Sequence, residues 1–420
     1  MKFKYTNTSG IEESIINKHK ASLSEYTKLS NKVIDEKNYE ADEASLCLPH
    51  DELILRAVRD IVKKKNSPQL KYIIDIGIGG SNLGTKAIYD ALLGYSDLFN
   101  INHAPKLVFL DTSDPEYISH FTQFIKENVK KKEEIVVNII SKSGGTTETA
   151  VNGEIVIELI SSLFNDWKER FVVTTNKHSH LWESAVSLGI DVMEIPKKVG
   201  GRYSVFSPVG LFPLALCGIN IELLLEGARS AGRGDSALSS AAILYEHLQQ
   251  GVAICDNFYF HSELESLGKW YRQLMGESTG KMGMGLTPTV SMGSVDLHSV
   301  VQLYLGGPKN RVTSFIYTNQ FSTVSIPAKN VLTHIQEIQG KNVGDIMSAI
   351  QHGTINAYKN VNLPLTEIVL EGINAKELGE YMQFKMWEIM YLGKLMKVNT
   401  FDQPEVELYK IETKKILSAK

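Results

Sequence analysis

A short polar turn in the first half of the chain has the chemistry of a phosphate site. The apolar, β-branched run 135–140 stops at Ser141-Lys142-Ser143-Gly144-Gly145-Thr146-Thr147-Glu148, where a helical pattern begins. Hydroxyls, one ammonium and the backbone N–H groups of a helix start all donate to phosphate oxygens, and the helix dipole adds partial positive charge. A serine- and threonine-rich helix cap without a ligand is the alternative, so other parts of the chain have to decide between the two.

A second glycine-rich turn, Gly77-Ile78-Gly79-Gly80-Ser81-Asn82-Leu83-Gly84, follows the first predicted strand. A dinucleotide-binding fingerprint would need glycine in place of Asn82, and Asp111 comes later than the roughly 20 residues expected of a ribose-binding acid. We therefore expect Gly80 and Ser81 to form a second phosphate-facing turn, with a nicotinamide-binding fold as the rival interpretation.

Glu277 is a candidate base. It lies in Gly276-Glu277-Ser278-Thr279-Gly280-Lys281, directly after an amphipathic helical pattern over 263–274 that ends near Met275. A carboxylate there faces the negative end of the helix dipole, which disfavours its charged form and suits a proton acceptor. The alternative is a surface glutamate in a loop.

His298 is a candidate acid or base, and Asp296, two residues earlier, could orient its ring. A structural histidine is the alternative, since the chain has 11 histidines. His178 and His180 resemble half of a metal site, but no cysteine or carboxylate nearby completes a set, so we expect a solvated loop and no metal.

The elements that must position these residues follow from the apolar pattern. Five short apolar runs separated by helix-length segments predict strands of a parallel sheet covered by helices on both faces: 72–78, 107–110, 135–140, 171–175 and 191–195. Ligands of such a sheet bind at the carboxyl ends of the strands. Residues 1 to 65 show helical spacing, and we expect those helices to pack onto this sheet.

A second α/β half follows the turn Gly200-Gly201-Arg202-Tyr203-Ser204. It has strand patterns at 289–292, 314–318 and 323–326 and helical patterns at 263–274, 375–396 and 406–417. We therefore expect an N-terminal helical segment (1–65), a first α/β domain (66–197) and a second one (198–420), with a ligand in the cleft between the halves.

Composition excludes several classes of protein. The 420 residues are 43% hydrophobic and 22% charged, and the net charge of -4 argues against nucleic-acid binding. Three cysteines at no metal-ligand spacing indicate reduced thiols in the cytoplasm, and the N-terminus has no apolar secretory segment. The uncharged stretch 203–221 contains Pro208 and Pro213, so we expect loop and buried helix rather than a membrane span.

Six stretches, in this order, resemble the glucose-6-phosphate isomerase family in its shorter bacterial-type form. They are 77–81, 141–144, 200–204, 276–281, 296–299, and Phe401-Asp402-Gln403-Pro404 with Val406, Glu407 and Lys410. The resemblance implies two sugar-isomerase-type (SIS) domains, each a mainly parallel sheet flanked by helices in three αβα layers. It also implies a homodimer with shared active sites and no metal or organic cofactor.

The resemblance also implies roles for single residues. Phosphate binding falls to Ser81, Ser141, Lys142, Ser143 and Thr146, and substrate contacts to Glu148 and Gln403. Glu277 matches the base that moves a proton between C2 and C1, and Arg202 the residue that stabilises the enediolate. His298 and Lys410 match the pair that opens the sugar ring, with His298 reaching across the dimer interface. Three positions depart from the family pattern: Gly145, Thr279 and Glu405, the last of which we expect to face solvent.

The chemistry agrees with these roles, because moving a proton next to a carbonyl needs a base and a fixed positive charge where the enediolate oxygen develops. We expect reversible isomerisation of glucose 6-phosphate and fructose 6-phosphate through a cis-enediol, in glycolysis and gluconeogenesis. The alternatives are an isomerase that also accepts mannose 6-phosphate, and a sugar-phosphate-sensing module without catalysis. A pure sensor would need only the phosphate turns, so the presence of Glu277, Arg202, His298 and Lys410 favours the enzyme.

Overall fold

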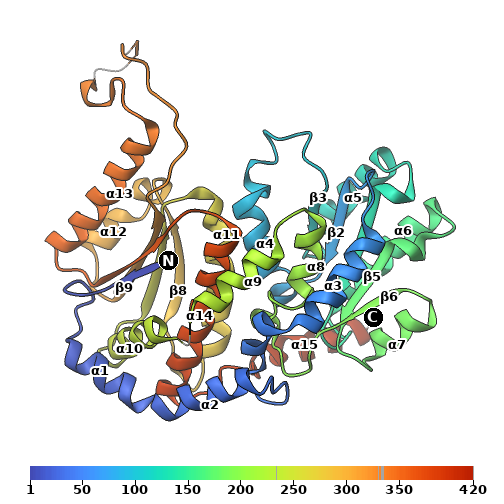
Figure 1. Cartoon of the computed structure of the whole chain (residues 1–420), viewed down its shortest axis with the longest axis horizontal. Helices are drawn as coiled ribbons and strands as arrows, with labels where there is room; N and C mark the ends of the chain where they lie inside the picture. The colour runs from blue at the N-terminus through green and yellow to red at the C-terminus, as the bar shows by residue number, and fades with distance from the viewer. Residues whose placement is uncertain (233, 330, 333–334, 420) are drawn as a thin grey trace.

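Two α/β halves lie side by side in the computed structural model, which describes residues 1–232, 234–329, 331–332 and 335–419 (Figure 1). The first half holds a five-stranded sheet in the order β3-β2-β4-β5-β6, with every neighbouring pair parallel. Its strands are β2 (Tyr72–Ile76), β3 (Lys106–Leu110), β4 (Ile135–Ile140), β5 (Phe171–Thr175) and β6 (Asp191–Glu194). All five predicted strands of this half are confirmed.

Helices cover both faces of this sheet, as the continuous apolar runs predicted. Val136 and Val172 pack with α3 (Glu52–Lys65), α4 (Leu83–Leu92) and α8 (Pro208–Leu216). Val137 and Val173, one residue further along, pack on the other face with α5 (Pro115–Asn128), α6 (Thr147–Leu163) and α7 (His180–Ser187). Alternate side chains of a strand point to opposite faces, so the three-layer arrangement is explained.

The second sheet has the order β1-β10-β9-β7-β8. Its strands are β1 (Lys2–Lys4), β7 (Ile254–Tyr259), β8 (Thr287–Met292), β9 (Arg311–Thr318) and β10 (Leu365–Leu370), and only the pairing of β1 with β10 is antiparallel. The predicted strands at 289–292 and 314–318 are confirmed. The predicted strand at 323–326 is wrong, because Ser325 makes only an isolated bridge to Asn342.

The N-terminal segment reaches both halves. Its helices are α1 (Glu13–Ser22), α2 (Ser24–Asp35) and α3. The expectation that they pack on the first sheet holds for α3, which contacts α8 and β6. By contrast, α1 packs on α10 (Asp235–Gln249) of the second half, and β1 extends the second sheet.

Helix α11 (Glu265–Thr279) connects the halves, because it packs on α4 of the first half and on β8 and α14 (Ala375–Met396) of the second. The stretch around Pro208 and Pro213 forms the buried helix α8, and α9 (Ile221–Ser230) comes after it. No helix within the described ranges is long and apolar enough to cross a membrane.

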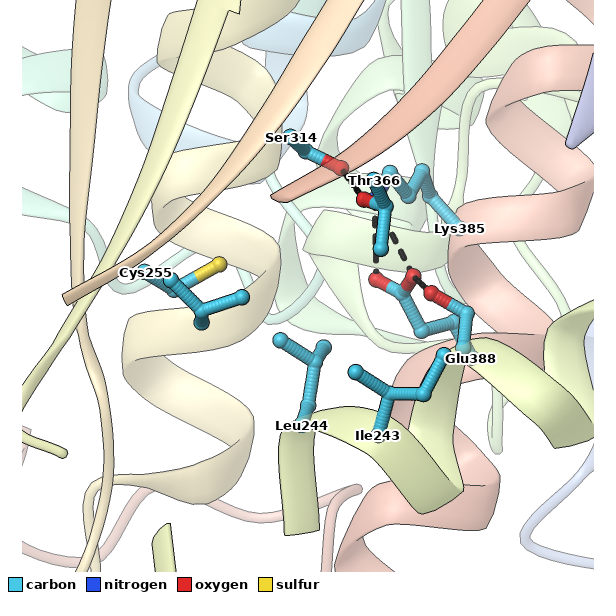
Figure 2. Close-up of a pocket in the computed structure, with 9 residues that line it drawn as sticks. Ile243, Leu244, Cys255, Ser314, Thr366, Lys385 and Glu388 are labelled. Atoms are coloured by element: carbon cyan, nitrogen blue, oxygen red, sulfur yellow. Dashed lines mark hydrogen bonds and ion pairs between the residues drawn. The ribbon is translucent and has the colours of Figure 1, made fainter. Parts of the chain in front are cut away.

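A buried ion pair lies within α14 (Figure 2). Lys385 Nζ lies 3.1 and 3.0 Å from the two carboxylate oxygens of Glu388. Ser240 of α10 and Tyr271 of α11 each donate a 2.5 Å hydrogen bond to the same carboxylate. The adjoining cavity of about 10 Å³ is the size of a single water, so it is too small for a sugar phosphate.

Candidate active site

The two glycine-rich turns lie at one edge of the first sheet. The short 3₁₀ turn η2 (Gly79–Ser81) comes after β2, and the turn 141–146 comes after β4. Because β2 and β4 are parallel neighbours, their carboxyl ends meet at this edge. The structure thus brings Gly80 and Ser81 to the same side of the molecule as Ser141 and Lys142.

Internal hydrogen bonds hold the turn 141–146 in shape. Gly144 N donates to Ser141 Oγ at 3.1 Å, and Gly145 N donates to Ser143 Oγ at 3.3 Å. Gly144 has φ +75°, a conformation that favours glycine. Thr146 is the N-cap of α6, and its side chain makes no hydrogen bond to the first helical turn, where Glu148 lies. The backbone N–H groups of that turn therefore remain available to an anion.

Positive charge concentrates beside this turn. Burial lowers the pKa of the Lys142 ammonium, and the positive charges of Arg202 and Lys198 lower it further. Since like charges disfavour one another, a bound anion would relieve the repulsion among these three cations. The electrostatics of the turn therefore suit a phosphate.

A close backbone contact joins η2 to the segment that carries Arg202. A Cβ atom added to Gly80 would lie 2.1 Å from the carbonyl carbon of Gly201, so only glycine fits there. Ser204 Oγ donates to Gly80 O at 3.2 Å across the same contact. As a result η6 (Gly201–Tyr203) packs directly on η2, which carries Arg202 to the edge of the first sheet.

The Arg202 guanidinium is the centre of the site. Its side chain is only 2% exposed. Nη1 lies 3.2 Å from Glu277 Oε2 and donates to Gln403 Oε1 at 2.7 Å, and Nε donates to Ser278 Oγ at 2.8 Å. The structure therefore brings together Arg202, Glu277 and Gln403 from three separate stretches of the chain.

Glu277 lies within the last turn of α11, since the helix continues to Thr279. The prediction that it lies after the helix is wrong by one turn, although the carboxylate still lies at the C-terminal end. Its Oε1 accepts a 2.9 Å hydrogen bond from Gln273 Nε2, one turn earlier on the same face. Sequence reasoning missed Gln273, and its four-residue spacing from Glu277 was the available signal.

Gln273 has a further property of a binding residue. Its Oε1 is buried and has no hydrogen-bond partner within the described residues. Its Nε2 lies 3.0 Å from where a Cβ on Gly79 would stand, and Gly79 has φ +60°. Gln273 thus lies between η2 and Glu277, and its Oε1 is available to accept a hydrogen bond.

His298 lies apart from these residues in the contacts of one chain. It is exposed at the end of η8 (Val295–His298), and its side chain makes no hydrogen bond or ion pair to any part of the chain that the structure describes. Asp296 accepts from Met292 N and from Ser299 Oγ, each at 2.7 Å. The structure therefore does not pair Asp296 with His298, because Asp296 holds its own loop instead.

Lys410 lies on α15 (Val406–Ser418), where it pairs with Glu407 at 2.7 Å and is 39% exposed. The helix confirms the pattern predicted for 406–417. Within one chain the structure does not bring Lys410 into contact with His298. Glu405 is exposed, as expected.

Thr279, the second departure from the family pattern, points back into its helix, since its Oγ1 donates to Met275 O at 2.8 Å. Gly145 lies exposed in the turn 141–146. His178 forms an exposed 3.2 Å pair with Glu183, in agreement with a solvated loop. His180 is exposed as well, but it is the first residue of α7, so the loop prediction is wrong for it. In the residues that the structure covers, no group of three or more histidine, cysteine or acidic side chains could hold a metal ion.

Comparison with known proteins gives a consistent result. A family model described as phosphoglucose isomerase matches residues 55–420. A probable glucose-6-phosphate isomerase of Methanococcus maripaludis is 31% identical over 97% of this chain and 92% of that protein. The glucose-6-phosphate isomerase of Methanocaldococcus jannaschii is 33% identical over 85% of this chain and 88% of that protein.

Solved structures agree in fold. A hypothetical protein of Thermus thermophilus superposes with a TM-score of 0.88 at 30% identity, over 99% of both chains. A glucose-6-phosphate isomerase of Chlamydia trachomatis superposes with a TM-score of 0.79 at 19% identity, over 99% of this chain and 88% of that one. The family match over most of the chain and the relatives above 30% identity lead to one conclusion: the chain belongs to the phosphoglucose isomerase family.

Proposed function

We propose that this protein is an aldose-ketose isomerase that interconverts glucose 6-phosphate and fructose 6-phosphate through a cis-enediol(ate). The observation that carries the proposal is the pairing of Glu277 with the buried Arg202 guanidinium at 3.2 Å, beside the two phosphate-facing turns. Two relatives, one named glucose-6-phosphate isomerase and the other probable glucose-6-phosphate isomerase, are 31–33% identical to this chain.

Glu277 would act as the base. Its carboxylate takes the proton from C2 of the open-chain aldose and returns it to C1. A second proton moves from the oxygen on C2 to the oxygen on C1, so the C2 hydroxyl becomes the ketone and the aldehyde becomes a hydroxyl. Arg202 faces the developing negative charge with a group that cannot lose its proton. Gln273 would orient the carboxylate through the hydrogen bond that it donates to Glu277 Oε1. No bound cofactor is needed, because the side chains supply both the base and the fixed charge.

The phosphate would be held by Gly80, Ser81, Ser141, Lys142, Ser143 and Thr146 together with the start of α6. Holding this distant group positions C1 and C2 for proton transfer. Glu148 and Gln403 would contact the sugar. Arg202 donates to the side-chain oxygen Oε1 of Gln403, so the side-chain NH₂ group of Gln403 remains free to donate to the substrate.

Ring opening would fall to His298 and Lys410, with His298 supplied by the partner in a homodimer. The exposed position of His298 within one chain supports this arrangement. Large apolar side chains that are more than three-quarters exposed could be covered by a second chain: Leu98, Phe99, Ile101, Met282, Val331 and Leu332.

We keep the division into a segment 1–65 and two SIS domains, 66–197 and 198–420, as part of the proposal. Each domain contains most of one sheet, and β1 ties the N-terminal segment to the second. We also propose a cytoplasmic location, in keeping with three buried cysteines that form no disulfide.

A competition assay tests the proposed reaction. Purified protein is given fructose 6-phosphate and mannose 6-phosphate together, without added metal; a coupled enzyme follows the formation of glucose 6-phosphate, and the loss of mannose 6-phosphate is measured separately. We expect conversion of fructose 6-phosphate to glucose 6-phosphate. Comparable turnover of mannose 6-phosphate would instead indicate dual specificity, and binding without turnover of either sugar would indicate a sensor.

A further inference from the structure

Lys281 closes the stretch 276–281, yet it takes no part in the proton transfer described above. Its side chain is 8% exposed, and its ammonium group contacts a single loop. It donates to the carbonyl oxygen of Asn399, to that of Asp402 at 2.8 Å, and to Asp402 Oδ1 at 2.5 Å. An ammonium has three N–H donors, so the loop uses all of them.

Arg202 also donates hydrogen bonds to this loop. Its Nη2 donates to the carbonyl oxygens of Thr400 at 2.6 Å and Asp402 at 2.9 Å. The carbonyl oxygen of Asp402 therefore accepts from two cations, and this carbonyl belongs to the peptide that leads into Gln403. Phe401, which lies between Thr400 and Asp402 in the sequence, packs on the ring of Tyr203 with ring centroids 5.7 Å apart.

The loop 399–403 also joins α14 to α15, the helix that carries Lys410. Two further hydrogen bonds lie within the loop itself. Asn399 Nδ2 donates to Asp402 Oδ2 at 3.0 Å, and Phe401 N donates to Asn399 Oδ1 at 2.9 Å. These bonds fix the shape of the loop but do not attach it to the body of the protein.

The backbone at Lys281 does not depend on its side chain. Lys281 and Met284 exchange two backbone hydrogen bonds, of 3.1 and 2.9 Å, in an isolated bridge. Replacing the ammonium would therefore leave the end of α11 in place while freeing one side of the loop 399–403. The carboxylate of Asp402, already 52% exposed, could then turn to solvent.

We infer that Lys281 is a positioning residue: it docks the loop 399–403 against the end of α11 and so holds Gln403 against Arg202 in the substrate site. This inference rests on the proposed function, since Gln403 contacts substrate only if that function is right. Lys281 itself touches no reacting atom.

The docking is tested first without substrate, by hydrogen exchange. We expect Lys281→Met to speed amide exchange at least tenfold in peptides that cover 399–405. The matched control is Lys269→Met on α11, the helix that ends just before Lys281, because Lys269 makes one exposed 2.7 Å pair with Glu265. It should leave exchange in those peptides unchanged. Unchanged exchange in Lys281→Met would overturn the inference, whatever reaction the protein catalyses.

The route to catalysis is tested by a double-mutant cycle on kcat/KM. Lys281→Met should lower kcat/KM about as much as Gln403→Ala does, by tenfold or more. In the Gln403→Ala background, Lys281→Met should lower kcat/KM by less than about threefold, because the side chain that Lys281 positions is already gone. Equal losses in both backgrounds would show that Lys281 acts only on general stability and would refute the positioning role. A wild-type protein without isomerase activity would refute the proposed function instead, and the exchange experiment would still decide the docking.

Discussion

At the scale of single residues, the site depends on one buried guanidinium that contacts several kinds of acceptor. Arg202 binds a carboxylate, a side-chain amide, a hydroxyl and two backbone carbonyls, and its five N–H donors are all engaged. This geometry fixes the position of the positive charge. In the proposed mechanism, the charge is therefore in place before substrate arrives and needs no rearrangement when the enediolate forms.

The hydroxyls of the turn 141–146 give a prediction about binding. Ser141→Ala with Ser143→Ala should weaken every phosphorylated ligand, because each hydroxyl lost from a charged phosphate costs roughly 1.5–3 kcal/mol. Calorimetric titration with fructose 6-phosphate and with inorganic phosphate measures the effect. Equal affinity in the wild type and the double variant would remove these hydroxyls from the phosphate site.

Residue patterns predicted part of this site. Glu277, Arg202 and Gln403 do meet. They could be predicted as site residues because each belongs to a recognisable local motif. Gln273 was missed, since a glutamine one helical turn before an acid is ordinary on any amphipathic helix. The pairing of Asp296 with His298 was expected from proximity in sequence, but the 3₁₀ turn directs Asp296 to Met292 N and Ser299 instead.

At the scale of elements, one polar residue within a strand did not by itself prevent its prediction. In the first sheet, β2 and β4 were predicted from their apolar runs although Asp75 and Asn138 interrupt them. In the second sheet, β7, which contains Asp256, and β10, which contains Glu367, were missed. Both carboxylates are buried and bound by other elements: Thr289 and Ser291 donate to Asp256, and Tyr317 donates to Glu367. These partners are distant in sequence, so no local pattern reveals them.

The buried pair in α14 gives a prediction about stability. Lys385→Met should lower the free energy of unfolding by about 3–5 kcal/mol, because it leaves Glu388 buried with no opposite charge. Urea denaturation measures the change.

Lys376→Met on the same helix is the matched control, because its 2.7 Å pair with Glu226 is exposed and its loss should hardly move the midpoint. If the two variants were equally stable, the buried pair would make no measurable contribution to the stability of the fold.

At the scale of the whole molecule, contacts between the halves build the site. Gly80 of the first half packs on Gly201 of the second, and α11 lies between α4 and α14. A ligand cleft between the two halves was expected from the sequence, but the packing of Gly80 on Gly201 could not be predicted from either turn alone. It depends on two backbone segments that are distant in the sequence.

The proposed homodimer gives a prediction by complementation. If His298 serves the partner's site, a mixture of inactive His298→Ala and inactive Glu277→Gln chains should regain activity, because each mixed dimer contains one intact site. Random exchange of subunits would restore about one quarter of wild-type activity. A mixture as inactive as its parents, with subunit exchange verified by differential tagging, would mean that His298 acts within its own chain.

The central claim is that Glu277 moves the proton, and one variant tests it most directly. For Glu277→Gln, turnover of fructose 6-phosphate and its binding affinity are measured on the same preparation. We expect kcat to fall by at least about 100-fold, because the amide cannot accept the proton, while the affinity stays within a few-fold of wild type, because the phosphate turns are untouched. Turnover within a few-fold of wild type would contradict the claim and remove Glu277 from the mechanism.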